Sequence, residues 1–206
     1  MKKNLIIIIL IIFPTLLFAD GGTYLQFEAG KSQLSSGVRI TAGSPTIDEN
    51  SETFGLTLGL NVFDKNTFVE IGYRDFGGYS MKGTLGDSIA SSFGATHNFG
   101  GEDSPKLKTH AKTKSIGVKR KMEIFDNLNI SGVLGFHNFN THHTQTGAFQ
   151  TVRDSTTKKY YGLGAEYKFN NIDFIFNYAH YDIDSSIVTL EHVETITAGV
   201  QYKKLF

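Results

Sequence analysis

The sequence predicts an all-β fold, an eight-stranded antiparallel up-and-down transmembrane β-barrel. Three observations support this prediction. Apolar and polar residues alternate with period 2 in eight segments, as they do in strands whose two faces meet different surroundings. The connections between these segments alternate between long and short. After residue 20 no apolar run approaches the ~20 residues of a membrane helix, as expected where half of each strand faces a polar lumen.

Residues 1–19 are predicted to be a signal peptide. Lys2 and Lys3 form a short basic region, an apolar run extends from Leu5 to Phe18, and Ala19 offers a small residue for cleavage. The alternative is a retained amino-terminal anchor, but the apolar run is too short to span a bilayer comfortably. We therefore expect residues 20–206 to form one β-barrel domain that is exported by a cleaved signal peptide.

The composition excludes several classes of protein. The chain has 206 residues, and its 20 Lys and Arg balance its 20 Asp and Glu. A nucleic-acid partner would favour a basic excess, so none is expected. Because the chain has no Cys, disulfide bonds, Cys-based metal sites and lipid attachment through Cys are excluded. No cofactor is predicted.

The first three predicted strands cover residues 23–31, 54–62 and 69–74. In each of them every second residue is apolar, as in Phe54-x-Leu56-x-Leu58, and the residues between are small or polar. The third strand is expected to end at Phe76-Gly77-Gly78.

The other five strands are predicted at residues 114–122, 128–136, 161–169, 172–179 and 194–206. Arg120 interrupts the apolar face of the fourth strand beside a turn, where a long side chain can extend to lipid head groups. In the last strand Ile196, Val200 and Tyr202 share the apolar face, and Phe206 ends the chain on that face. Gly199, Gln201 and Lys203 share the opposite face.

The connections predict the orientation of the barrel. Four are long and polar, at residues 33–51, 78–111, 140–158 and 182–191, and three are short, at 64–66, 123–127 and 170–171. Bacterial barrels have short periplasmic turns and long external loops, so the four long connections should be external. A soluble barrel or sandwich is the alternative, but the opposite faces are too polar for a dry core. Ten strands remain an option if residues 78–111 contain a hairpin.

Several strand segments resemble those of a known family. V-E-I-G-Y-R-D-F-G at residues 69–77, followed by Lys82-Gly83, is similar to the third strand of the OmpA transmembrane domain. The segments at 126–130, 164–167 and 198–202 resemble its turn into strand five, its sixth strand and its last strand. The opacity-type small barrels share this plan, so the resemblance is to the superfamily. It implies the bacterial outer membrane as the location, and lipopolysaccharide and the barrel assembly machinery as partners.

The resemblance also implies an assembly signal and a shorter chain than in full-length OmpA. A terminal aromatic residue on the closing strand is the ending of such barrels, and we assign this signal to Tyr202 and Phe206. Because the chain ends at strand eight, the peptidoglycan-binding domain of full-length OmpA is not expected.

Charged residues of the lumen-facing parity are predicted to form a network. An eight-stranded barrel is just wide enough to be filled by side chains, so charges inside must be paired. The members we assign are Glu28, Glu70, Arg74, Lys119, Glu166 and Lys168. In the family two glutamates pair with a lysine and an arginine, and Glu70 and Glu166 fall on the glutamate positions. The lysine and arginine positions are occupied by Ser115 and Ile175. A proton or ion path is the alternative to a structural network.

Histidines and serines at the external strand ends allow two further hypotheses, neither of which we favour. His142 and His143 lie together in the third external connection, next to His137 on the fifth strand. His180 and His192 bracket the fourth connection. Histidines in a flexible, solvated loop bind zinc or copper only weakly. A lipid A-modifying enzyme would need Ser and His within hydrogen-bond reach, with a carboxylate to orient the His. The candidate group lies near one strand end and consists of His180, Asp182, Ser185 and Ser186.

The function we predict is display. The barrel is expected to be a monomer without enzyme activity, fixing four polar connections at the cell surface for contact with a host, matrix or phage ligand. Residues 33–51 and 78–111 are the preferred binding segments. A narrow, low-conductance pore is the second hypothesis, because polar residues line the lumen.

Overall fold

The computed structural model describes residues 22–62, 64–91, 96–99, 107–145, 148–185 and 190–203. The predicted signal peptide, residues 1–19, and Phe206 lie outside these ranges. Among the described residues, no helix is long and apolar enough to cross a membrane.

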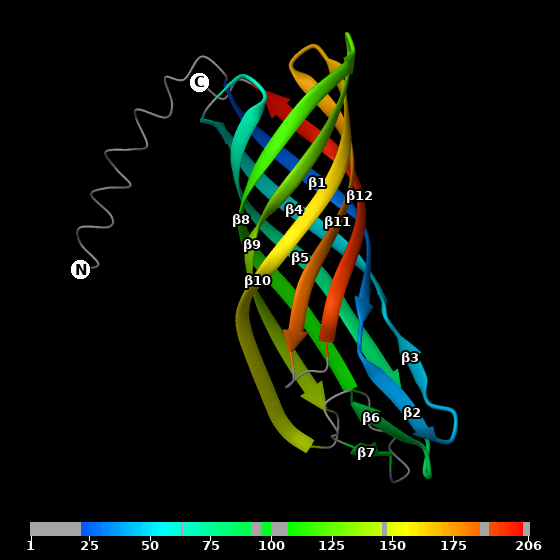
Figure 1. The fold of residues 1–206 in the computed structure, drawn as a ribbon. Helices are drawn as coiled ribbons and strands as arrows, with labels where there is room; N and C mark the ends of the chain where they lie inside the picture. Colours follow the sequence, from blue (N-terminus) through cyan, green and yellow to red (C-terminus); the bar gives the residue numbers. More distant parts are fainter. Residues whose placement is uncertain are drawn as a thin grey trace, which may run out of the picture.

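Eight long antiparallel strands form the wall of a closed barrel (Figure 1). Each strand pairs with the next long strand along the chain, and β1 pairs with β12 to close the wall. The strands are β1 (Thr23–Ser35), β4 (Asn50–Asn61), β5 (Thr67–Lys82), β8 (Leu107–Phe125), β9 (Leu128–Gln145), β10 (Ala148–Phe169), β11 (Ile172–Ser185) and β12 (Leu190–Lys203). The predicted fold class is therefore confirmed.

The two ends of the barrel differ in their connections. At one end, the turn end, tight turns join β4 to β5, β8 to β9 and β10 to β11, and β1 begins beside the end of β12. Asn170 adopts a φ of 56° in the last of these turns, a conformation that asparagine tolerates. The opposite end, the loop end, carries the longer connections. The turn end is at the top of Figure 1, where β12 also ends.

The outward face of the wall is apolar over a broad band that begins at the turn end. Phe27 is 51% exposed and Leu163 is 70% exposed, whereas the inward-facing Glu166 is fully buried. A soluble barrel would place its apolar face inside, so the soluble alternative is wrong. The arrangement is that of a barrel surrounded by lipid, with a polar interior.

The strands extend further toward the loop end than the sequence predicted. β5 does not end at Phe76-Gly77-Gly78 but runs to Lys82, because Gly77 adopts a φ of 71° in a bulge and pairing with β8 resumes there. A Cβ atom at Gly77 would lie 2.0 Å from Ser51 Oγ, so only glycine allows this close approach. Residues 140–158 are predicted to be a loop, but the described ones, 140–145 and 148–158, continue the paired strands β9 and β10.

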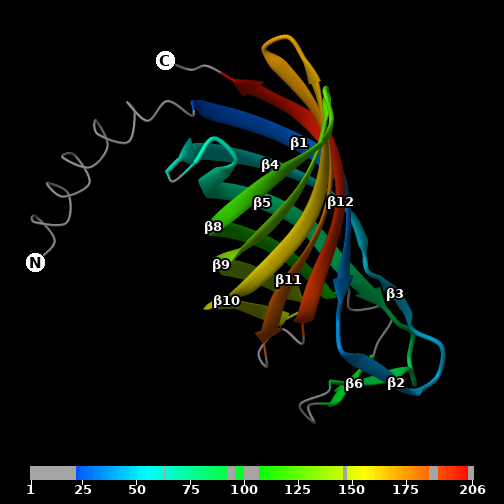
Figure 2. The same ribbon diagram turned by 45° about the horizontal axis from the view of Figure 1, so that its top comes forward.

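The first two long connections build a separate structure at the loop end. Here β2 (Val38–Ala42), β6 (Ser88–Ser91) and β7 (Thr96–Asn98) form a three-stranded antiparallel sheet, which we call the loop-end sheet. β3 (Thr46–Asp48) pairs with the end of β5. The 78–111 segment therefore does contain a hairpin, β6–β7, but the hairpin lies outside the wall and the barrel keeps eight strands. Figure 2 shows this sheet beside the strand ends.

The hydrophobic core lies inside the loop end and not at mid-barrel. Its buried side chains come from every barrel strand except β4, and from the segment that contains the loop-end sheet. The members are Leu34, Phe76, Tyr79, Met81, Ile89, Phe99, Ala111, Phe139, Tyr160, Ala179, Tyr181, Ile183, Leu190 and Val193. The interior thus changes from polar near the turn end to apolar near the loop end, and we call this apolar part the loop-end core.

Candidate functional site

Charged side chains fill the interior between the turn end and the loop-end core. The acids are Glu28, Glu70, Glu166 and Asp173, and the bases are Arg74, Lys119, Lys121 and Lys203. The four negative and four positive charges balance. This balance matters because an uncompensated ion in a low-dielectric interior costs several kcal/mol.

The network begins at the turn end. Lys203 on β12 pairs with the fully buried Asp173 on β11. Gln201 donates from Nε2 to Asp173 Oδ2 at 3.1 Å, and its Oε1 accepts from Lys121 Nζ at 3.2 Å. The amide of Gln201 therefore links the rim pair to the charges deeper inside.

Glu166 is the centre of the network. Its Oε1 lies 2.7 Å from Lys119 Nζ, and its Oε2 lies 2.6 Å from Lys121 Nζ. Both lysines come from β8, on successive inward positions, and Lys119 Nζ also lies 3.5 Å from Glu70 Oε1. Each carboxylate oxygen of Glu166 thus has its own ammonium partner, which is the arrangement that a buried carboxylate requires.

Tyr24 closes the second side of this cluster. Its hydroxyl donates to Glu70 Oε1, and its ring centre lies 4.5 Å from Lys121 Nζ, in the range of a cation–π interaction. The ring has room because residue 59 is glycine: a Cβ there would lie 2.2 Å from Tyr24 Cζ.

Glu28 and Arg74 form the part of the network nearest to the loop-end core. Glu28 Oε2 pairs with Arg74, while its Oε1 accepts from Asn177 Nδ2 at 2.5 Å and from Thr197 Oγ1 at 2.7 Å. The Arg74 guanidinium also lies over the ring of Tyr181, with 6.0 Å from Cζ to the ring centre. Arg74 therefore joins the ion network to the aromatic residues on its loop-end side.

A small cavity of about 50 Å³ remains among these side chains. Polar groups of Glu28, Glu70, Arg74 and Lys119 line it, together with Tyr160 and Tyr181. Its volume and polar lining suit a few water molecules. The interior of the described barrel therefore holds a small polar pocket between a charged layer and an apolar layer.

Stacked aromatic rings cover this pocket on the loop-end side. The rings of Tyr160 and Tyr181 are stacked at 5.2 Å, and the ring of Phe76 meets Tyr181 edge-on at 4.8 Å. His137 lies against Tyr181 at 5.2 Å, with Nε2 2.7 Å from the carbonyl oxygen of Asp182. Its Nδ1 lies 2.9 Å from Thr113 Oγ1, so both ring nitrogens have partners inside the barrel.

The structure brings most of the sequence-assigned charges together. Glu28, Glu70, Arg74, Lys119 and Glu166 lie in one network, as described above. Lys168 does not join them. Its Nζ lies 2.9 Å from Glu123 Oε1 at the exposed rim of the turn end, because β10 has already left the interior there.

Sequence reasoning missed Lys121, Asp173, Lys203 and Tyr24 as members. Lys121 is two residues beyond Lys119 on the same face, so strand parity alone could have identified it. Ser115 and Ile175, which occupy the lysine and arginine positions of the family, both lie inside the barrel. Ile175 is buried, and Ser115 lines the small polar pocket. Lys119 and Lys121, further along the strand of Ser115, neutralise Glu166 in this chain.

An acidic residue organises the loop-end sheet. Asp87 Oδ2 accepts from the backbone N–H of Thr84 at 2.7 Å, and its Oδ1 accepts from that of Ser44 at 2.9 Å. These two hydrogen bonds hold the pKa of Asp87 below its ordinary value. The carboxylate thus ties the turn after β2 to the turn before β6.

Of the remaining predicted residues, Tyr202 and His180 lie on the outside of the wall. Tyr202 is 45% exposed on the apolar band near the turn end, and Phe206 lies outside the described residues. His180 faces outward, with Nε2 3.1 Å from Asp182 Oδ1. Ser185 ends β11, and Ser186 lies outside the described residues.

The chain is similar to known proteins in its family and in its fold. The chain matches the model of the OmpA-like transmembrane domain over residues 19–205. Comparison with curated protein sequences returned no match.

Solved structures with the same fold include three small barrels. The attachment invasion locus protein Ail of Yersinia pestis, in complex with the heparin analogue sucrose octasulfate, has a TM-score of 0.50 at 15% identity, covering 89% of this chain and 99% of Ail. Neisserial surface protein A has a TM-score of 0.50 at 12% identity, covering 89% and 97%. The barrel domain of Pseudomonas aeruginosa OprF has a TM-score of 0.52 at 12% identity, covering 88% and 97%.

The family match covers the whole described barrel, and the barrel has the strand number, faces and connections that the family resemblance implied. The chain belongs to the OmpA-like transmembrane domain family of outer-membrane β-barrels.

Proposed function

We propose that this barrel is a non-enzymatic anchor that holds a preformed binding surface outside the cell. One observation carries the proposal: the two preferred binding segments are not independent loops but pair as β2 and β6 on top of the loop-end core. A surface ordered before binding loses less conformational entropy when a partner docks.

The chemistry of this surface favours a protein partner. Ile40 on β2 is 48% exposed, and Leu85, just before β6, is 79% exposed. Both lie at the loop end, away from the apolar band that faces lipid. Large apolar side chains on an ordered external surface are typical of contacts with other proteins. We therefore propose a host or matrix protein as the partner, ahead of a phage receptor role.

The experiment compares cells that display the wild-type barrel with cells that display Ile40→Asp/Leu85→Asp. We expect the double variant to lose most adhesion to immobilised matrix proteins. The matched control is Thr46→Asp, which adds a charge at an exposed position of β3 without removing apolar surface. Unchanged adhesion by the double variant, with equal display on the cell surface, would overturn the proposal.

Lipopolysaccharide is the membrane partner we propose. On β8, Lys112 and Lys114 are exposed on the outward face directly beyond Ile116 of the apolar band, on the loop-end side. Lys159 of β10 is exposed across β9, in register with Phe136 of β9 and Ile116 of β8. Ammonium groups just beyond an apolar band suit anionic head groups. Replacing the three lysines with Gln should weaken retention of lipopolysaccharide on the purified barrel, which gel staining measures.

A narrow pore is the second candidate, because charged and polar side chains do line the inside of the wall. Against it stand the paired charges and the aromatic layer of Phe76, Tyr160 and Tyr181. Lipid A modification is not proposed. Mass spectra of lipid A from deletion and overexpression strains, if altered, would overturn the non-enzymatic assignment.

A further inference from the structure

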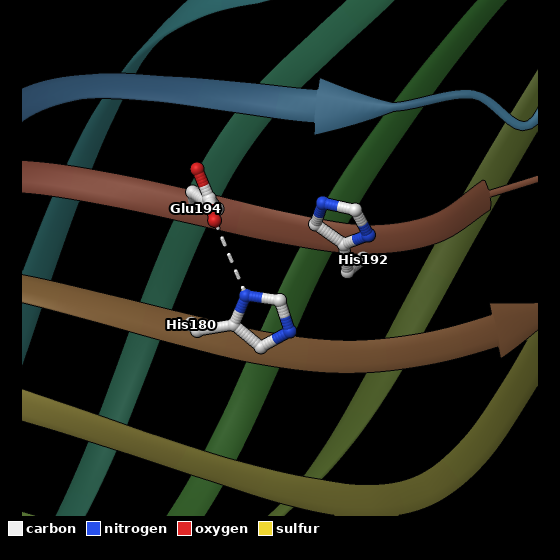
Figure 3. A group of neighbouring side chains, drawn as sticks. All are labelled: His180, His192 and Glu194. Atoms are coloured by element: carbon white, nitrogen blue, oxygen red, sulfur yellow. Dashed lines mark hydrogen bonds and ion pairs between the residues drawn. The ribbon is translucent and has the colours of Figure 1, made fainter.

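We propose that the outer wall of the barrel carries a divalent transition-metal site formed by His180, His192 and Glu194. His192 and Glu194 are two residues apart on β12, so both face outward, and His180 lies opposite Glu194 on β11. The potential ligand atoms of the three residues lie within 4.8 Å of one another. Figure 3 shows the two imidazole rings and the carboxylate close together on the two neighbouring strands, with His180 joined to Glu194.

The group lies at the loop-end edge of the lipid-facing band. Its nearest outward neighbours toward the turn end are Tyr178 and Ile196, which face each other across the same two strands and are exposed. All three proposed ligands are half-buried. The site therefore belongs to the outer surface and shares no residue with the ion network of the lumen.

The surroundings of His180 point to a cation. Its Nε2 lies 3.1 Å from Asp182 Oδ1, and its Nδ1 lies 3.4 Å from Glu194 Oε1. A neutral imidazole has one donor and one acceptor nitrogen, so it can donate to only one of these two carboxylates. The other nitrogen faces an acceptor, and either a second proton or a bound metal ion resolves that conflict.

The distances also fit a shared metal ion. Two ligands bound tetrahedrally to zinc at 2.0–2.1 Å are about 3.3 Å apart, and His180 Nδ1 and Glu194 Oε1 are already 3.4 Å apart. His192 supplies the third ligand: one of its ring nitrogens belongs to the group of ligand atoms that lie within 4.8 Å of one another, and its ring is stacked on that of His180. Two imidazoles and one carboxylate suit zinc, copper or nickel.

Neighbouring side chains support the ligands as they do in protein metal sites. His180 Nε2, the nitrogen that would not bind the metal, can donate a hydrogen bond to Asp182. Such a carboxylate–histidine pair fixes the orientation of the ring. The Tyr178 hydroxyl donates to Glu194 Oε1 at 2.9 Å, and the ring of Tyr161 is stacked on that of His180 at 5.0 Å. With three protein ligands, one position stays open for water or for a group on a partner.

The test titrates the full barrel, folded in detergent micelles, with zinc chloride. We expect saturable heat release, and imidazole NMR spectra in which the His180 Nδ1 resonance shifts. His180→Asn, His192→Asn and Glu194→Gln should each weaken zinc binding at least about tenfold. A large excess of magnesium should not compete, because magnesium prefers oxygen ligands.

The matched control is His142→Asn, an exposed histidine that faces His110 across β8 and β9 outside the proposed site. It should bind zinc as the wild type does. Absence of both heat and imidazole shifts in the wild type would overturn the site, as would cluster variants that bind like the wild type. Folding is checked by heat-modifiable migration. If a variant fails to fold, the imidazole shifts of the wild type decide alone.

Discussion

Lys119 and Glu166 meet inside the barrel with 2.7 Å between Nζ and Oε1, although β9 separates their strands in the wall. The pair therefore reaches across the interior and does not run along the wall. Lys121 joins the same carboxylate from the next inward position of β8. Pairs of this kind fill the lumen with side chains and at the same time link strands that are not neighbours in the wall.

Lys119→Met should destabilise the barrel strongly. The change leaves Glu70 and Glu166 with one fewer cation, and breaking a buried ion pair costs about 3–5 kcal/mol. Urea unfolding in lipid vesicles measures the loss. The charge-balanced double variant Lys119→Met/Glu166→Gln should recover a large part of it. If the double variant is no more stable than the single one, the pair is not what stabilises this region.

Because the interior is closed, we expect the barrel to conduct almost no ions in planar bilayers. No steady open state of large conductance is expected from the wild type, because ion pairs and aromatic rings fill the cross-section. Tyr181→Ala removes a ring that contacts Phe76, Tyr160 and His137, and should raise the frequency of small openings. A large, steady wild-type conductance would favour the pore instead.

Gly59→Ala should cost roughly 1–3 kcal/mol, the usual range for overpacking an interior. The new methyl group would overlap the ring of Tyr24, which holds Glu70 and lies against Lys121. Gly132→Ala is the matched control, since its Cβ would have only ordinary contacts, with Leu163 Cδ2 at 3.9 Å. Equal stability of the two variants in urea unfolding would contradict the role of Gly59.

Acid should loosen the loop-end sheet before it affects the wall. The pKa of Asp87 is lowered in the folded protein by hydrogen bonds from the backbone of Thr84 and Ser44. Its contribution to stability is therefore complete above the unfolded value of about 3.9, and is lost as the pH falls through the lower folded value. Hydrogen exchange of β2 and β6 amides should rise in that range. In Asp87→Asn the exchange should already be faster at neutral pH and should lose this pH dependence.

Strand parity predicted the barrel and most of its lumen charges. Glu28, Glu70 and Glu166 could be assigned inward because every second residue of a strand faces the same side. Parity cannot say which charges meet, since partners such as Lys119 and Glu166 come from strands that are not neighbours. It also cannot show where a strand leaves the interior, which is why Lys168 was assigned to the network although it pairs with Glu123 at the rim.

The loop end was harder to predict because its segments are polar and glycine-rich in sequence. Gly77 and Gly78 signal a strand end, and only the contact with Ser51 shows that Gly77 is a bulge inside a continuing strand. Ile89 and Phe99 are isolated apolar residues in the chain. They are buried in a cluster whose other members come from the barrel strands, and such long-range packing leaves no local periodicity to detect.

The position of the loop-end core has a consequence for the order in which the molecule is completed. Leu34, Phe76, Phe139 and Ile183 belong to four different pairs of strands, so they can meet only after all of those strand ends have crossed the bilayer. Until then each of these apolar side chains lacks the side chains that it packs against in the finished barrel. The loop-end core is therefore the last part to form. Once the wall has closed, this packing makes it costly for any single hairpin to leave the membrane.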